Sequence, residues 1–403
     1  MAPVGVSEGH ALVGDVPLSG AVPAQELFPI TIVAHDVGPM GGMEQQLSQL
    51  VTGLLARGAS VTVVSRTCEL QPHPRLRWVR VPGPARPFTL AYPWFAIVGS
   101  LLVRRHRRGV LHTTGAIVVN HADVCTVHFC HCGRRWNGRL DRRSRRGALY
   151  ALNAASSAAL ARIGERLSYR PARVGRLVAV SRGLGAELKR TFPALAERIA
   201  VIPNGVDTTR FRPDAARRHE VRNEIGVPET DLLALFVGSE WEGKGLGVAL
   251  EAVGSVDGCQ LAVVGAGDVP RYVALARDAG VEGRVHFLGE RRVPERYHAA
   301  ADVFVLPSAY ETFSLVAYEA AAAGLPLLAT RVHGVDELLV DGENGWFVDR
   351  DADALAARLA RLRDHPDQRR SLGNAARAAS ERYSWGRMVD AYVELYRELA
   401  DAA

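Results

Sequence analysis

The sequence has few cysteines, and its first residues do not combine a basic segment with an apolar core. Its five cysteines are odd in number and unevenly spread over 403 residues, which excludes a disulfide framework and favours a reducing, cytoplasmic compartment. Residues 1–27 contain no lysine or arginine and no continuous apolar core, so they lack the features of a signal peptide. We expect these residues to form a disordered leader.

Long apolar runs are also scarce. The most membrane-like stretch, residues 87–103, is uncharged but contains Pro93. This stretch is barely long enough for a membrane-spanning helix, which takes about 20 residues. We expect a buried or surface-docked helix here.

The net charge of +6 is concentrated in two basic segments. They are residues 134–146, from Arg134 to Arg146, and the cluster Arg104, Arg105, Arg107 and Arg108. A solvated loop is one interpretation, and contact with an anionic membrane surface or a charged acceptor glycan is the other. We expect no nucleic acid as a partner, since no nucleic-acid-binding module accompanies the charge.

Strand and helix patterns alternate in two successive halves. Each half opens with an apolar strand, a glycine-containing loop and a helix, at residues 30–57 and 232–253. This order predicts two Rossmann-like, doubly wound α/β domains whose ligands lie in a cleft at the carboxyl ends of the strands. We expect the domains at residues 28–203 and 204–382, and a last helix in residues 383–403 that packs back on the first domain.

An acidic loop runs directly into a short helix in residues 308–326. Four consecutive alanines favour the helix, and Gly324 and Pro326 end it. The pattern predicts Ser314 as the N-cap, with unpaired amides behind it that attract anions. Glu311 and Glu319 flank this positive end, so a phosphate would need a nearby cation, and sugar hydroxyls would suit the carboxylates.

This segment resembles the two-glutamate signature of retaining glycosyltransferase family 4, which has the GT-B fold. Further segments resemble family motifs in the expected order, and together they cover nearly everything from Ile30 onward. They are the glycine loop at residues 41–44, the interdomain segment at 202–207 with Phe211, the lysine loop at 238–245, and residues 302–308.

The resemblance implies a role for each matching residue. Glu319 would bind the ribose of a nucleotide sugar, Glu311 would face the donor sugar, and Lys244 would neutralise the diphosphate. His128, at the end of a first-domain strand, would also face the sugar. The diphosphate would also be contacted by backbone amides, those of Gly41 or Gly42, Phe313, Ser314 and Leu315.

One feature departs from the family pattern. Relatives often carry an arginine shortly before the lysine, and residues 238–243 contain none. Either Lys244 acts with amides alone, or Arg291 or Arg292 takes the place of that arginine.

His128 also belongs to a cluster with Cys130, His131 and Cys132. On a strand, His131 would point away from the other three, and four ligands so close together rarely wrap one metal ion. A histidine facing the sugar, a core histidine and a zinc ligand remain as alternatives. We expect no metal.

The resemblance implies a metal-independent, retaining glycosyltransferase without a cofactor. It would move a sugar from a nucleotide diphosphate sugar to a glycan, lipid-linked or small-molecule acceptor, in the cytoplasm or at the inner face of the cell membrane. Alternatives are a nucleotide-sugar epimerase or isomerase of the same fold, and an inactive GT-B-like binding protein.

Overall fold

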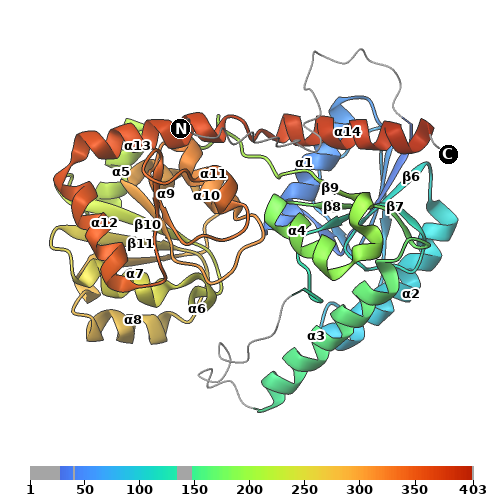
Figure 1. Cartoon of the computed structure of the whole chain (residues 1–403), viewed down its shortest axis with the longest axis horizontal. Helices are drawn as coiled ribbons and strands as arrows, with labels where there is room; N and C mark the ends of the chain where they lie inside the picture. The colour runs from blue at the N-terminus through green and yellow to red at the C-terminus, as the bar shows by residue number, and fades with distance from the viewer. Residues whose placement is uncertain (1–27, 40, 134–147, 402–403) are drawn as a thin grey trace, which may run out of the picture.

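The computed structural model describes residues 28–39, 41–133 and 148–401 (Figure 1). The expected leader, residues 1–27, and the arginine-rich residues 134–146 lie outside these ranges. In the described part of the chain, no helix is both long and apolar enough to span a membrane.

The first domain is built on a seven-stranded parallel sheet. Its strand order is β5-β3-β1-β6-β7-β8-β9. The strands are β1 (Ile30–Val33), β3 (Val61–Ser65), β5 (Leu76–Arg80), β6 (Val110–Thr114), β7 (Ala122–Val127), β8 (Val174–Ala179) and β9 (Ile199–Val201). Every residue of β1 and β3 is buried, and all except Ser65 are apolar or β-branched, as expected for a sheet that is covered on both faces.

Four helices that lie between the strands of this sheet in sequence accompany it among the described residues. They are α1 (Gly42–Ala56), α2 (Phe88–His106), α3 (Ala148–Ser168) and α4 (Arg182–Thr191), with a 3-10 turn at Pro193–Arg198 and a small two-stranded ribbon of β2 (Asp36–Val37) and β4 (Thr67–Cys68). Helices α2 and α3 run side by side along one flank of the domain (Figure 1). The helix predicted in residues 87–103, buried or surface-docked, is present as α2.

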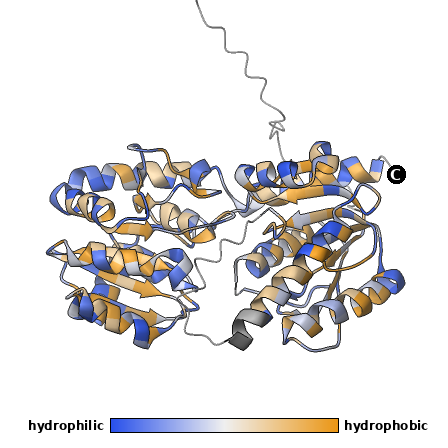
Figure 2. Cartoon of the chain, turned by 60° about the horizontal axis from the view of Figure 1, so that its bottom comes forward, coloured by the Kyte–Doolittle hydropathy of each residue, from blue (hydrophilic) through white to orange (hydrophobic). Residues whose placement is uncertain are grey.

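The second domain repeats the plan with a six-stranded parallel sheet in the order β12-β11-β10-β13-β14-β15. Its strands are β10 (Leu232–Val237), β11 (Cys259–Val264), β12 (Val285–Gly289), β13 (Val303–Leu306), β14 (Leu327–Ala329) and β15 (Gly345–Phe347). Figure 2 shows the hydrophobic strands enclosed by helices whose outer faces are hydrophilic.

Helices and a 3-10 turn connect these strands. They are α5 (Ala215–Ile225), α6 (Trp241–Lys244), α7 (Leu246–Gly254), α8 (Val269–Asp278), the 3-10 turn Glu282–Arg284, α9 (Glu295–Ala300), α10 (Leu315–Ala322), α11 (Val335–Leu338), α12 (Ala352–Asp364) and α13 (Pro366–Ser380). The residues predicted as a plain loop around Lys244 partly form the short helix α6.

The last helix, α14 (Trp385–Asp401), crosses back to the first domain and packs on α1, as predicted (Figure 1). Its Tyr392 and Tyr396 are fully buried against that domain's core. Asp390 forms an ion pair with Arg57 at 2.6 Å. The chain therefore ties the two halves together twice, through residues 202–207 and through α14.

Candidate active site

The loop after β10 fixes the position of Lys244. The aliphatic stem of Lys244 passes directly over Gly238, whose φ is +146°, and a Cβ there would lie 2.5 Å from the lysine Cδ. Only glycine leaves room for the lysine to lie across the strand end. The sequence GSEWEGKG thus places one ammonium group at the carboxyl edge of the sheet.

Lys244 meets Glu311 at this edge, because β10 and β13 are neighbours in the sheet. Lys244 Nζ donates a hydrogen bond to Glu311 Oε1 at 2.6 Å, and Ser308 Oγ donates to the same oxygen at 3.1 Å. The lysine and glutamate side chains are 22% and 13% exposed, so the pair is partly shielded yet reachable. An entering diphosphate would compete with Glu311 for the ammonium group.

The start of α10 differs from the prediction at one residue. Ser314 stands at the N-cap position, but its φ is +66° and its side chain makes no capping hydrogen bond. Its hydroxyl is buried without a partner. The prediction of a serine cap was wrong because the left-handed backbone turns the hydroxyl away from the helix, which leaves the first-turn amides uncapped.

The glycine loop of the first domain approaches this helix end. A Cβ built on Gly42 would lie 3.5 Å from Leu315 Cδ1, so the starts of α1 and α10 meet across the two domains. Helix α1 also lacks a capping side chain; Gly41, at its N-cap, has a φ of +90°. Glu44 folds its carboxylate over Gly41, and burial raises the pKa of this group. Two helix ends with positive partial charge therefore face one region.

Glu319 is buried on α10, with 8% of the residue exposed. Burial raises its pKa to about 7, while nearby Arg210 and a hydrogen bond from Gln45 lower it. Gln45 belongs to α1, so this contact also joins the domains. Nothing in the sequence pattern singled out Gln45 or Arg210.

His128 directly follows Val127, the last residue of β7, and so lies at the end of a first-domain strand. Both of its ring nitrogens are buried without a hydrogen-bond partner, and burial lowers its pKa to about 4. The imidazole is therefore neutral near pH 7 and has free hydrogen-bonding capacity.

The rest of the histidine and cysteine cluster is held in a turn. Glu165 accepts hydrogen bonds from the amides of His131 and Cys132, both at 2.8 Å, and pairs with His131 Nδ1 at 2.9 Å. The backbone leaves the strand because this buried carboxylate holds it. Among the described residues, no group of three or more His, Cys, Asp or Glu side chains is arranged to hold a metal ion.

A second set of contacts between the domains lies beside Glu311. Glu187 on α4 accepts a hydrogen bond from Tyr310 at 3.4 Å and lies 3.6 Å from His333 Nε2. This carboxylate raises the pKa of His333. Nearby, the amide of Arg182 donates to Glu337 at 2.6 Å. Sequence patterns carry no signal for these pairs, because each joins residues more than 100 positions apart.

The two candidate substitutes for the absent arginine lie after β12. Arg291 and Arg292 are exposed, and neither forms an ion pair with a residue that the structure describes. The lysine loop is instead braced by Arg350, whose Nε donates to the carbonyl of Pro307 at 3.1 Å and whose Nη2 donates to the carbonyl of Glu242.

Comparison with protein families yields two matches that divide the chain. Residues 40–210 match the model described as Glycosyltransferase Family 4, and residues 217–379 match the one described as Glycosyl transferases group 1. A D-inositol 3-phosphate glycosyltransferase of Xylanimonas cellulosilytica is 32% identical over 397 residues, which cover 90% of this chain and 92% of that protein.

Solved structures show the same architecture. The glycosyltransferase WaaG, involved in lipopolysaccharide biosynthesis, superposes with a TM-score of 0.76 at 21% identity and covers 91% of this chain and 98% of its own. Anabaena HepE in complex with UDP and glucose reaches a TM-score of 0.70 at 18% identity over 92% of this chain and all of its own, 100%. At these identities the likeness concerns the fold.

Proposed function

Because this chain belongs to glycosyltransferase family 4, a group of EC 2.4 enzymes with the two-domain GT-B fold, we propose that it moves a sugar from a nucleotide diphosphate sugar to an acceptor held by the first domain. The observation that carries the proposal is the meeting of the starts of α1 and α10, neither of which has a capping N-cap side chain, with Lys244 nearby at the edge of the second sheet. Such a site favours a diphosphate.

Each proposed donor contact has a structural rationale. The diphosphate lies against the amides of Phe313, Ser314 and Leu315 and those of Gly41 or Gly42. Glu319, one turn further along α10, accepts hydrogen bonds from the ribose hydroxyls. UDP, which is bound in the Anabaena structure, is one candidate nucleotide.

Lys244 acts on the leaving group. Negative charge builds on the diphosphate as the glycosidic bond breaks, and a fixed ammonium group beside helix ends stabilises that charge more in the transition state than in the ground state. We propose that these groups supply the positive charge that a metal ion supplies elsewhere. When the diphosphate replaces Glu311 as the partner of Lys244, the Glu311 carboxylate becomes free to bind sugar hydroxyls.

The sugar itself lies between Glu311 and His128. The neutral His128 ring brings two unpaired buried nitrogens, one of which can donate to a sugar hydroxyl and the other accept from one. We propose transfer with retention through a front-face, oxocarbenium-like step, in which the acceptor hydroxyl attacks on the side that the diphosphate leaves. Glu311 is therefore not assigned as a nucleophile.

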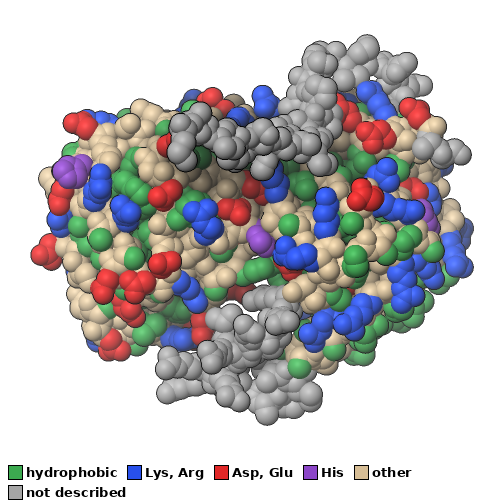
Figure 3. All heavy atoms as spheres, in the orientation of Figure 1, with side chains coloured by type: hydrophobic (Ala, Val, Ile, Leu, Met, Phe, Trp, Pro, Cys, Tyr) green, Lys and Arg blue, Asp and Glu red, His purple; other side chains and the backbone are tan. Residues whose placement is uncertain are grey.

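We also propose that the enzyme works in the cytoplasm, at the inner face of the membrane. An apolar stripe runs along one face of α2 at helical spacing: Leu90, Trp94, Ile97 and Leu101 are 63%, 49%, 63% and 59% exposed. Arg104, Arg105, Arg107 and Arg108 follow it and are also exposed. Figure 3 shows hydrophobic and basic side chains together along the flank where Figure 1 places α2 and α3. Apolar and basic groups in this order suit an anionic lipid surface.

Product analysis tests the transferase proposal. The protein is incubated with a panel of nucleotide sugars, with and without acceptors such as a polyol phosphate, which the name of the Xylanimonas relative suggests. A glycosylated acceptor with the anomeric configuration of the donor is expected. A rearranged donor without acceptor would indicate an epimerase or isomerase, and no turnover with any donor would indicate a binding protein.

A further inference from the structure

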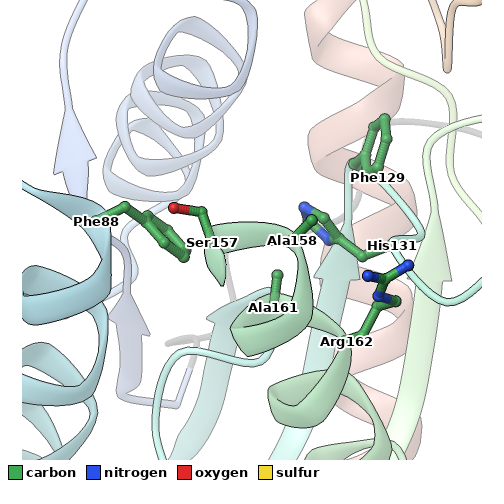
Figure 4. A pocket seen from close by; sticks show the side chains of 7 residues that line it. All are labelled: Phe88, Phe129, His131, Ser157, Ala158, Ala161 and Arg162. Atoms are coloured by element: carbon green, nitrogen blue, oxygen red, sulfur yellow. The ribbon is translucent and has the colours of Figure 1, made fainter. Parts of the chain in front are cut away.

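An apolar pocket of about 280 Å³ lies beside the proposed donor site in the first domain (Figure 4). It is bounded by the start of α2, one face of α3 and the turn after β7. Its lining consists of Phe88, Phe129, His131, Ser157, Ala158, Ala161 and Arg162. None of these residues has a role in the donor site.

The walls of the pocket are mostly hydrocarbon. Phe88 stands at one side and Phe129 at the other, and alanines of α3 form the floor between them (Figure 4). Because these alanines are small, they leave the space open. The volume is close to the lower limit of about 300 Å³ for ligand pockets, enough for an aromatic ring or a short alkyl segment.

Two polar groups in the pocket lack a side-chain partner among the described residues. The hydroxyl of Ser157 points toward Phe88, is buried and makes no hydrogen bond (Figure 4). Arg162 forms no ion pair with any residue in the described ranges. Buried polar groups are usually hydrogen-bonded, so an orphaned hydroxyl in an otherwise apolar pocket indicates a ligand with a polar substituent.

The pocket adjoins the reacting centre through Phe129. This ring lies next to His128 in the chain and 5.5 Å from the ring of Tyr310, which directly precedes Glu311. A molecule with its apolar end between Phe88 and Phe129 would therefore extend its other end toward the residues proposed to hold the donor sugar.

We propose that this pocket is the acceptor subsite and that the acceptor is amphipathic, with an aromatic or alkyl group in the pocket and a hydroxyl at the donor sugar. The proposal rests on the transferase function and adds the chemical class of its acceptor. Two sources share this chemistry: a soluble aromatic glycoside and the first part of a lipid chain.

Matched glycosides test the subsite by binding rather than by turnover. Methyl, phenyl and octyl β-glucoside, the last below its micelle concentration, are titrated into the full-length protein by calorimetry. We expect the phenyl or the octyl compound to bind at least about tenfold more tightly than the methyl compound, because its apolar group leaves water. Preference for phenyl alone identifies a soluble aromatic acceptor, and preference for octyl alone a lipid-like one.

Substitutions locate the binding. Ala158→Trp fills the pocket and is expected to abolish the preference, and Phe88→Ala, at a half-exposed wall residue, to weaken it without disturbing the core. Ala155→Trp is the control, because Ala155 is exposed on the same helix and does not line the pocket. Equal binding of all three glycosides by the wild type would overturn the subsite, and so would a preference that survives both pocket variants.

Titration with a nucleoside diphosphate in the same samples separates the two proposals. If nucleotide binding persists while the glycoside preference is absent, only the subsite fails. If no nucleoside diphosphate binds, the transferase function fails whatever the glycosides show.

Discussion

The two glutamates of the signature occupy different environments although they lie only eight positions apart. Glu311 is held in an ion pair with Lys244, whereas Glu319 is buried on α10 and receives a hydrogen bond from Gln45. Their positions agree with the proposal that Glu311 binds the donor sugar and Glu319 binds the ribose. Each carboxylate is already hydrogen-bonded without a ligand, so donor binding exchanges protein contacts for ligand contacts.

The raised pKa of Glu319 predicts a pH effect on stability. Its pKa is about 7 in the folded chain against an ordinary 4.5. Between these values the unfolded chain ionises this group and the folded chain does not, so stability falls as pH rises through this window and then levels off. The melting temperature of Glu319→Gln minus that of the wild type should therefore increase by a few degrees from pH 4.5 to 7 and stay constant above.

The melting temperatures are measured without nucleotide by calorimetry. Glu251→Gln, at an exposed position on α7, serves as the control and should follow the wild type at every pH. A constant difference between Glu319→Gln and the wild type across the whole range would contradict a buried, protonated carboxyl.

At the scale of elements, a buried network of hydrogen bonds helps apolar packing to hold α14 against the first domain. His112 is hydrogen-bonded to Tyr396 at 2.6 Å and to Thr126 at 2.7 Å, and Thr126 in turn to Tyr392 at 2.7 Å. Tyr396→Phe would leave Nδ1 of His112 buried and unpaired. We expect a loss of about 1–3 kcal/mol in the free energy of unfolding, measured with urea. An unchanged free energy of unfolding would show that this network does not stabilise the packing of α14.

The stripe on α2 predicts a specific loss of membrane binding. Leu101→Glu places a charge on the apolar face and should abolish co-sedimentation with vesicles that contain anionic lipid. Leu275→Glu is the matched control, since Leu275 is an exposed leucine on α8 of the second domain. If both variants bind vesicles as the wild type does, α2 is not the docking face.

Element boundaries could be predicted where the signal is local and not where tertiary contacts decide. Glycines and strand residues located the start of the loop after β10 and the loop at Gly41, but they did not predict that Trp241–Lys244 forms the short helix α6. The turn after β7 could not be predicted, because Glu165, far along the chain, holds it. Likewise, no local pattern reveals that Ser314 adopts a left-handed backbone, so its side chain was assigned as a cap.

At the scale of the molecule, charged and aromatic groups form part of the contact between the domains. Glu187 and His333 pair across them at 3.6 Å, and the pKa of His333 is raised by this contact. The pair is charged at low pH and is lost as pH rises above the pKa of His333. We expect a smaller radius of gyration by X-ray scattering at pH 6 than at pH 8.5.

Glu187→Gln should remove this difference, because the amide cannot form the ion pair. A variant that contracts at low pH as much as the wild type would show that another group controls closure. Sequence motifs predicted the two-domain fold and proposed donor-site residues such as Lys244, Glu311 and Glu319, but they gave no role to Glu187, Gln45 or Tyr310. Contacts between domains depend on how two separately folded surfaces meet, and this is not encoded in either motif alone.

The proposed transfer depends most directly on binding of the diphosphate by Lys244. A panel of nucleoside diphosphates is titrated by calorimetry into the wild type, Lys244→Ala and Lys189→Ala; Lys189 is the only other lysine in the sequence and is exposed on α4. We expect the nucleoside diphosphate of one base to bind the wild type and Lys189→Ala with equal affinity. Lys244→Ala should bind it more weakly and, with the matching nucleotide sugar as donor, should turn over about 10²–10³-fold more slowly. If Lys244→Ala binds the nucleoside diphosphate and turns over as the wild type does, or if the wild type binds no nucleoside diphosphate, the proposed transfer mechanism is contradicted.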